Sequence, residues 1–340
     1  MADKKNIEVL STIPLSEAQM ERIRNVNKLV RLTVVKYRDG EVASPEQWHK
    51  TEVLFTGGRN VPAVQDVQNL RWVHVAFAGV DALVNTPLMR QPNVTVTSSS
   101  GVMISQMGEY VVMALLMLGH KMHEIFRLQK DAKWGESKDM TPVELRGSTV
   151  GIVGYGSVGR EIARRLHPFN VTVLAAKRDA TKPEDKGFTP DGLGDPHGDY
   201  FDRLYPIEAL KGMLSQCDFV VLAIPLTEET RNLFTTEVFN AMKPGAFLVN
   251  VARGEVITDL ALEQALKSGQ VGGAVLDVFA QEPLPSDSPL WNLKNVIITP
   301  HVSGLSSHYM DDMVALFCEN LSRYIEGQAL HNVIDAEKGY

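Results

Sequence analysis

Three side chains in the second half of the chain have the chemistry to bind an anion and to move a proton. Arg253 follows the apolar run of residues 248–252, and a guanidinium can bind a carboxylate and a keto oxygen together. Glu282 and His301 follow the next two apolar runs, and an imidazole exchanges a proton near neutral pH. Taken singly, they could also be a helix-cap arginine, a solvated glutamate and a core histidine. Because ligands of open α/β sheets bind at the carboxyl ends of strands, we expect Arg253 and His301 to face a cleft.

A glycine-rich turn stands in the middle of the chain, after the apolar run of residues 149–153. Gly154 allows a sharp turn out of a strand, Gly156 lets the backbone approach a pyrophosphate, and Gly159 allows close packing of helix on strand. The helix that starts with Ser157 and Val158 would offer its N–H groups to the phosphates. The pattern therefore predicts a dinucleotide site, although a tight turn of another α/β protein would look similar.

Further motifs follow this turn, and together they resemble the D-isomer-specific 2-hydroxyacid dehydrogenases, the family of phosphoglycerate, glyoxylate/hydroxypyruvate and formate dehydrogenases. The resemblance runs from about residue 70 to the C-terminus and is strongest over residues 145–304. Its motifs beyond the glycines are Pro225-Leu226-Thr227-x-x-Thr230, Asn250-x-x-Arg253-Gly254, Asp277-Val278-Phe279-x-x-Glu282-Pro283 and Thr299-Pro300-His301. As a set in this order, they are highly specific.

The resemblance implies a role for each of these side chains. It makes His301 the acid and base that exchanges a proton with the substrate oxygen, and Glu282 its partner, which holds the tautomer and favours imidazolium. It makes Arg253 the group that binds the substrate carboxylate and carbonyl, and Asp277 the group that holds the nicotinamide carboxamide.

The resemblance extends to backbone groups on both sides of the expected cleft. It implies that the N–H groups of Ala78 and Gly79, within residues 77–81, bind the substrate carboxylate. The other cofactor contacts that it implies are Ile224, Pro225, Thr230, Val251, Ala252, Arg253 and His301. Two details depart from the family pattern: Gly108, where alanine is usual, and Ser303-Gly304, where glycine usually comes first.

The elements that would position these residues alternate between strand and helix. Strands are expected at residues 7–10, 30–35, 52–55, 72–76 and 94–97, then at 149–153, 171–176, 219–224, 246–251, 272–276 and 296–299. A helix is expected over residues 104–129, and a last one over 306–326 returns the chain to the first domain. The fold class is α/β with two Rossmann-like domains of parallel sheet. A dinucleotide-binding domain, 103–305, is inserted into a discontinuous, flavodoxin-like substrate domain, 1–102 plus 306–340.

Residues that follow the second strand of the dinucleotide domain bear on the choice of cofactor. An NAD enzyme normally places an acidic residue there, but this chain has Lys177-Arg178, and Asp179 only afterwards. Because lysine and arginine attract a 2′-phosphate, we predict NADP (NADPH) in preference to NAD. Binding of NAD through Asp179 remains the alternative. The Gly- and Pro-rich residues 179–205 are expected to form an exposed insertion near the adenosine.

Composition excludes several other classes. The 340 residues carry a net charge of −7, which disfavours nucleic acid as a partner. Cys217 and Cys318 suggest neither a disulfide nor a metal site, and no apolar run is long enough to span a membrane. We therefore expect a cytoplasmic protein without metal. The very apolar residues 111–118 suit burial at an interface, and the family suggests a homodimer.

The expected function is NAD(P)H-dependent reduction of a small 2-keto acid, such as glyoxylate or hydroxypyruvate, to the D-2-hydroxy acid. One alternative is a dinucleotide-sensing binding protein that resembles the family's co-repressors. Another is a phosphoglycerate- or formate-type dehydrogenase of the same family. A methyltransferase would leave Arg253, Glu282 and His301 without a role.

Overall fold

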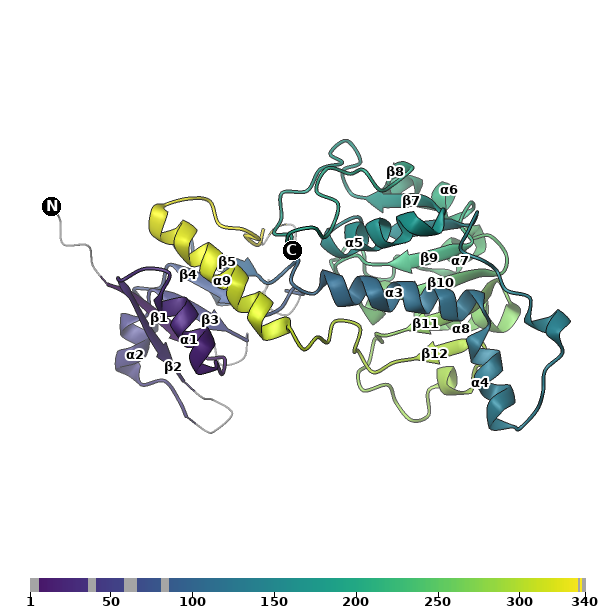
Figure 1. Ribbon diagram of the computed structural model, residues 1–340, viewed down its shortest axis with the longest axis horizontal. Coiled ribbons are helices and arrows are strands. Elements are labelled where there is room, and N and C mark those ends of the chain that lie inside the picture. Colours follow the sequence, from purple (N-terminus) through teal and green to yellow (C-terminus); the bar gives the residue numbers. More distant parts are fainter. Residues whose placement is uncertain (1–5, 36–40, 58–65, 81–85, 336, 338–340) are drawn as a thin grey trace. The chain divides into compact units, whose positions relative to one another are not determined.

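The chain forms two compact units in a computed structural model that describes residues 6–35, 41–57, 66–80, 86–335 and 337. The small unit comprises Met1–Val102 with Ser307–Tyr340, and the large unit comprises Met103–Ser306 (Figure 1). Ser306 thus belongs to the large unit, one residue beyond the boundary expected from the sequence. The α/β class with two parallel sheets is confirmed.

The small unit is built on a parallel sheet with strand order β2-β1-β3-β4-β5. Its strands are β1 (Ile7–Ser11), β2 (Val30–Val34), β3 (Val53–Thr56), β4 (Trp72–Val75) and β5 (Thr95–Ser98). Its helices are α1 (Glu17–Arg24), α2 (Pro45–Lys50) and α9 (Tyr309–Glu326). The ring of Phe317 on α9 stacks on Phe55 and Trp72, with centroids 4.3 and 5.1 Å apart. The last helix therefore completes the core of the first domain, as the sequence predicted.

The large unit is built on a parallel sheet with strand order β12-β11-β10-β9-β6-β7-β8. Its strands are β6 (Thr149–Val153), β7 (Thr172–Lys177), β8 (Arg203–Pro206), β9 (Phe219–Leu222), β10 (Ala246–Asn250), β11 (Val271–Leu276) and β12 (Val296–Ile298). The prediction of six strands in this sheet was wrong. The additional strand is β8, which lies at the end of the expected insertion. Its four residues pair with β7 although their sequence lacks a long apolar run.

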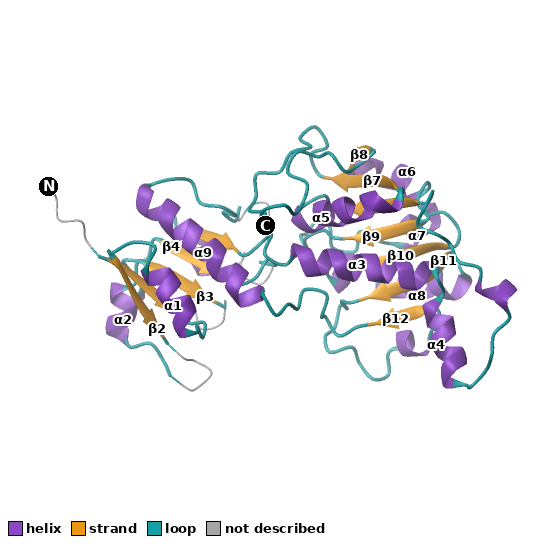
Figure 2. Ribbon diagram, viewed as in Figure 1, coloured by secondary structure: helices purple, strands orange, loops and turns teal. Residues whose placement is uncertain are grey.

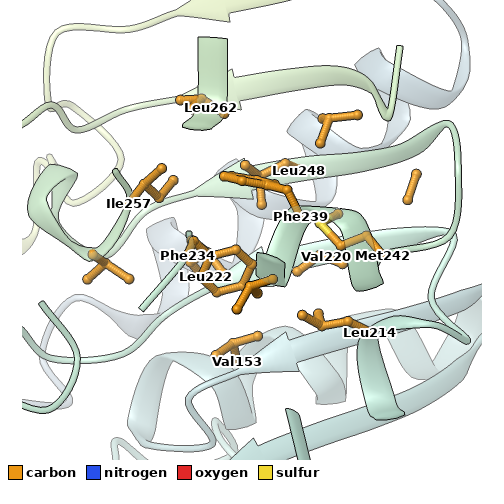
Figure 3. Close-up of a cluster of buried hydrophobic side chains, with 14 of the residues drawn as sticks. Val153, Leu214, Val220, Leu222, Phe234, Phe239, Met242, Leu248, Ile257 and Leu262 are labelled. Carbon is orange, nitrogen blue, oxygen red and sulfur yellow. The ribbon is translucent and has the colours of Figure 1, made fainter. Parts of the chain in front are cut away.

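Helices cover both faces of the large sheet (Figure 2). They are α3 (Ile104–Gly119), α4 (Met122–Lys130), α5 (Ser157–Leu166), α6 (Leu210–Leu214), α7 (Thr236–Ala241) and α8 (Asp259–Ser268). Val220 and Leu222 of β9 point into the core formed with α6, α7 and α8 (Figure 3), whereas Val221 points into the core formed with α3 and α5. This alternation explains why the central strands read as continuous apolar runs.

The single helix expected over residues 104–129 was wrong, because the structure has two helices there. The carbonyl of Gly119 accepts a hydrogen bond from the N–H of Val143, and Lys121 adopts a left-handed backbone with φ 54°. A residue in that conformation cannot continue a right-handed helix. In the described part of the chain, no helix is both long and apolar enough to cross a membrane. The cytoplasmic location stays a prediction.

Candidate active site

The expected site residues lie along one edge of the large sheet because its strands are parallel and adjacent. In the strand order β12, β11, β10, β9, β6 and β7, the residues that follow the carboxyl ends are His301, Asp277, Arg253, Ile224, Gly154 and Arg178. Residues up to 147 positions apart in sequence, Gly154 and His301 among them, thus follow the ends of strands in one sheet. Ala78 and Gly79 belong to the small unit, in the loop after β4, and Asp81 lies outside the described residues.

The glycine-rich turn joins β6 to α5, and its glycines have different reasons to be glycine. Gly154 has φ 105°, and a Cβ there would lie 2.4 Å from the carbonyl oxygen of Ala223. A Cβ on Gly159 would lie 2.1 Å from the carbonyl oxygen of Gly154. A Cβ on Gly156, the N-cap of α5, would meet nothing within 4 Å. The packing of the chain requires Gly154 and Gly159, whereas Gly156 leaves open space at a helix N-terminus, where a phosphate is favoured.

Residues after β9 and β10 form short, internally bonded turns at the same edge. Thr230 donates its hydroxyl hydrogen bond to the carbonyl of Pro225, 2.7 Å away, and its oxygen accepts from the N–H of Thr227 at 2.8 Å. The N–H of Val251 bonds to the carbonyl of Leu222, at 3.2 Å, which joins the ends of the two strands. The other predicted cofactor contacts, including Ile224 and Ala252, lie in or next to these turns.

The backbone at Arg253 is held by the buried side chain of Asn250. This asparagine belongs to the sequence motif, but the sequence alone assigned it no role. The side chain of Asn250 accepts from the N–H of Ala252 at 3.0 Å and donates to the carbonyl of Arg253 at 3.2 Å. The asparagine is 1% exposed, whereas Arg253 is half-buried. The buried amide therefore fixes the backbone from which the guanidinium extends.

Glu282 and His301 are brought together, as the resemblance implied. The Nδ1 atom of His301 lies 2.8 Å from Oε2 of Glu282, and the other carboxylate oxygen accepts from the N–H of Phe279 at 3.0 Å. A carboxylate accepts only, so Nδ1 carries the proton of this bond. The two side chains are 49% and 36% exposed, so Nε2 of a half-exposed ring is the atom that can exchange a proton with a ligand.

Asp277 is fully buried and bonded to the turn that carries His301. Its carboxylate accepts hydrogen bonds from the hydroxyl of Thr299 at 2.6 Å and from the N–H groups of Val302 and Ser303, both at 2.9 Å. Its carbonyl accepts from the N–H of His301, also at 2.9 Å. The structure thus gives Asp277 contacts that the sequence did not reveal. The predicted contact with a nicotinamide carboxamide stays a prediction.

The basic pair that ends β7 lies among charged groups. The ammonium of Lys177 donates to the carbonyl of Lys182 at 2.8 Å, and burial lowers its pKa, assisted by the nearby charge of Arg160. Arg178 pairs with Glu229 at 2.7 Å. The carboxylate of Asp179 accepts from both the hydroxyl and the N–H of Thr181 and pairs with Lys182 at 3.0 Å.

The hydroxyl of Thr181 and the charge of Lys182 hold the pKa of Asp179 at about 2. Asp179 is therefore ionised and bonded within its own loop.

The segment 179–205 is fastened to α5 rather than free, which the sequence could not show. Tyr155, inside the glycine motif, donates to the carboxylate of Asp195 at 2.6 Å. Arg160 is 2% exposed and donates to the carbonyls of Asp195 and Pro183. Glu161 accepts from the N–H of Gly194 at 2.7 Å. Because these partners flank the glycine-rich turn, the insertion forms part of the surroundings of that turn.

Comparisons with known proteins identify the family to which the chain is similar. The family model described as D-isomer specific 2-hydroxyacid dehydrogenase, NAD binding domain, matches residues 112–303. The chain is 33% identical to a glyoxylate reductase of Korarchaeum cryptofilum over 71% of this chain and 69% of that protein. It is 29% identical to the glyoxylate/hydroxypyruvate reductase B of Pectobacterium carotovorum, over 84% of this chain and 85% of that one.

A solved structure is similar over almost the whole chain. It is a D-isomer specific 2-hydroxyacid dehydrogenase from Xanthobacter autotrophicus, in complex with NADPH and MES. The TM-score is 0.80 at 28% identity, and the match covers 98% of this chain and 100% of that one.

Proposed function

We propose a reaction for this chain, which belongs to the D-isomer-specific 2-hydroxyacid dehydrogenases and is a nicotinamide-dependent oxidoreductase. The reaction is reduction of a small 2-keto acid, of the glyoxylate and hydroxypyruvate type, to the D-2-hydroxy acid. The observation that carries it is the 2.8 Å contact between His301 and Glu282, at the sheet edge where Gly156 leaves room for a dinucleotide. Two relatives named glyoxylate reductase and glyoxylate/hydroxypyruvate reductase B support the substrate class.

In the proposed mechanism, the reduced nicotinamide supplies a hydride to the carbonyl carbon of the substrate when it is bound. His301 gives a proton from Nε2 to the carbonyl oxygen, and takes it back in the reverse reaction. Glu282 stays on Nδ1, which fixes the ring orientation and leaves Nε2 to exchange the proton. Such acid catalysis is worth about 10²–10⁴ in rate.

Arg253 binds the substrate carboxylate and the carbonyl oxygen, where its charge stabilises the developing negative charge. The family resemblance assigns carboxylate binding to the N–H groups of Ala78 and Gly79, which belong to the small unit. The small unit is thereby the substrate domain and the large unit the nucleotide domain.

A panel of 2-keto acids assayed with NADPH tests the reaction, with chiral analysis of the product. We expect turnover of glyoxylate and hydroxypyruvate, and its loss in His301→Ala with NADPH binding retained. Turnover that survives this substitution would exclude His301 as the acid. A dinucleotide-sensing binding protein predicts no turnover on any substrate, and a phosphoglycerate- or formate-type enzyme predicts turnover of those substrates instead.

For the cofactor, the proposal is NADP in preference to NAD. Lys177 ends β7, where a carboxylate would repel a 2′-phosphate, and the carboxylate of Asp179 is bonded to Thr181 and Lys182. We expect a higher kcat/KM with NADPH than with NADH, and a shift toward NADH in Lys177→Asp. Lys186→Asp makes the same charge change further along the segment and controls for long-range electrostatics. A clear NADH preference of the unchanged enzyme would refute the choice.

The proposal includes a homodimer formed through the large unit. Met113 on α3 and Phe126 on α4 are 44% and 49% exposed, and Trp134 after α4 is fully exposed. These exposed large apolar side chains, on α3, on α4 and after α4, support an interface at this part of the unit. Light scattering should give twice the mass of one chain, and Trp134→Ser with Phe126→Ser should shift it toward the monomer. A monomeric mass of the unchanged protein at micromolar concentration would refute this.

A further inference from the structure

The turn that carries His301 has a backbone that side-chain residues rarely adopt. His301 has φ 54°, in the left-handed region. That conformation costs a residue with a Cβ about 1–2 kcal/mol and persists only where neighbouring groups hold it. The imidazole is 49% exposed, so its own packing supplies little of this hold.

Asp277, on the neighbouring strand, holds the centre of the turn. It bonds to the N–H groups of His301, Val302 and Ser303, so three consecutive residues are fixed by one buried residue. Its carboxylate also accepts the hydroxyl proton of Thr299, which starts the turn.

Helix α3 holds both ends of the same turn. Gln106 donates from Nε2 to the carbonyl of Gly304 at 3.1 Å, and the hydroxyl of Tyr110 lies 2.6 Å from Oγ1 of Thr299. Gln106 and Tyr110 are four residues apart and therefore share one face of the helix. One helix face thus contacts the residue two positions before His301 and the residue three positions after it.

The direction of the bond at Tyr110 follows from a count of protons. Thr299 has one hydroxyl proton and gives it to Asp277, so Tyr110 must be the donor to Thr299. Burial raises the pKa of Tyr110 to about 12, so the phenol keeps its proton throughout the range of an enzyme assay. The result is a directed chain from Tyr110 through Thr299 to Asp277.

We propose that Tyr110 and Gln106 are positioning residues for His301, which they hold in its left-handed turn through Thr299 and Gly304. The inference rests on the proposed role of His301 as proton donor. Their hydrogen bonds go to Thr299 and Gly304, so both residues act through the turn that orients the imidazole. Loss of the Tyr110 hydroxyl should therefore loosen the bond between His301 and Glu282 and leave the glycine-rich turn unchanged.

The test compares Tyr110→Phe with Tyr205→Phe. Tyr205 is buried on β8 of the same unit, and its hydroxyl accepts one hydrogen bond from Gln216 at 3.2 Å. We expect Tyr110→Phe to lower kcat on glyoxylate with NADPH about three- to tenfold, because a small misplacement of a reacting group is costly. The dissociation constant for NADPH and the Tm should match those of Tyr205→Phe, which should keep its kcat. Gln106→Leu with Tyr110→Phe should lower kcat further than either substitution alone.

A second readout does not depend on turnover. Carbethoxylation of His301 by diethylpyrocarbonate, followed by peptide mass spectrometry, should be faster in Tyr110→Phe than in the unchanged protein or in Tyr205→Phe. If the labelling rate and kcat of Tyr110→Phe equal those of the control, the inference is overturned. If the unchanged protein turns over no keto acid, the proposed function fails, and the labelling rate still decides whether Tyr110 positions His301.

Discussion

Two turns at the same edge of the large sheet reach unusual backbone conformations by opposite means. The turn between β6 and α5 places glycine at its left-handed position, where Gly154 has φ 105°. The turn after β12 places His301 at φ 54° and holds it with Asp277 and with side chains of α3. The first turn needs only its own residues, whereas the second depends on residues far away in the sequence. The proposed role of His301 requires its imidazole, so glycine cannot take its place and the strain has to be balanced by distant contacts.

The largest expected effect comes from a substitution that removes the imidazole of His301 but tolerates the left-handed backbone at this position. His301→Gly should lower kcat/KM by about 10²–10⁴, because the proton donor is lost. Its free energy of unfolding should change by no more than about 1 kcal/mol, since glycine adopts a positive φ without steric penalty. Kinetics and urea denaturation measure the two quantities. His301→Ala keeps the strain and should lose equal activity, and a glycine variant several kcal/mol less stable would mean that the turn is not strained.

The next-largest effect concerns the glycine-rich turn between β6 and α5. Gly154→Ala should lower the free energy of unfolding by about 3 kcal/mol, because it combines a forbidden φ with a Cβ 2.4 Å from the carbonyl oxygen of Ala223. Gly156→Ala is the matched control: its stability should stay within about 0.5 kcal/mol, because the added methyl group meets no atom of the chain.

Gly156→Ala, which should leave the stability unchanged, should weaken the binding of the cofactor. Gly156→Ala should bind NADPH about tenfold more weakly, the equivalent of about 1.4 kcal/mol, measured by titration of nucleotide fluorescence. Unchanged affinity would show that the phosphate does not approach Gly156.

A smaller effect contrasts His301 with a buried histidine of the small unit. Burial lowers the pKa of His74 to about 3, while its ring nitrogens contact Thr97 and Ser99 at 2.8 and 3.2 Å. The unfolded chain takes up this proton below about pH 6.5, and the folded chain only near pH 3. The contribution of His74 to stability is therefore complete above pH 6.5 and is lost as the pH falls.

Between pH 8 and pH 5 this loss is about 2 kcal/mol in the unchanged protein. His74→Gln should remove that part of the pH dependence while leaving the pH profile of kcat unchanged, as urea denaturation and kinetics at both values would show. Equal acid sensitivity of the two proteins would contradict the assignment.

The smallest expected effect tests whether contacts between residues far apart in the sequence also hold the segment 179–205 near the glycine-rich turn. Tyr155→Phe removes one hydrogen bond to the buried Asp195, worth about 1 kcal/mol. Trypsin cleavage after Lys186 should then be about five times faster, because opening of the segment costs less. The unchanged protein is the reference, and equal cleavage rates in the two proteins would mean that Tyr155 does not fasten the segment.

The central strands, the glycine motif and the pairing of Glu282 with His301 could be predicted from the sequence, with the family resemblance supplying the pairing. The break of the helix after Gly119 could not, because it involves a left-handed Lys121 and a hydrogen bond from Val143, which no local pattern indicates. Strand β8 was missed because its pairing with β7, rather than an apolar run, makes it a strand.

The sequence by itself determined the central strands, the glycine-rich turn and the types of side chain that follow them, since apolar periodicity and glycine spacing are local properties. Only the tertiary structure decided how those side chains are held. The contacts of Asp277, Tyr110 and Gln106 with the His301 turn, and of Tyr155 and Arg160 with residues 179–205, join segments far apart in the sequence. Hydrogen-bond partners of this kind are chosen by the packing of sheet and helices, and no local pattern encodes them.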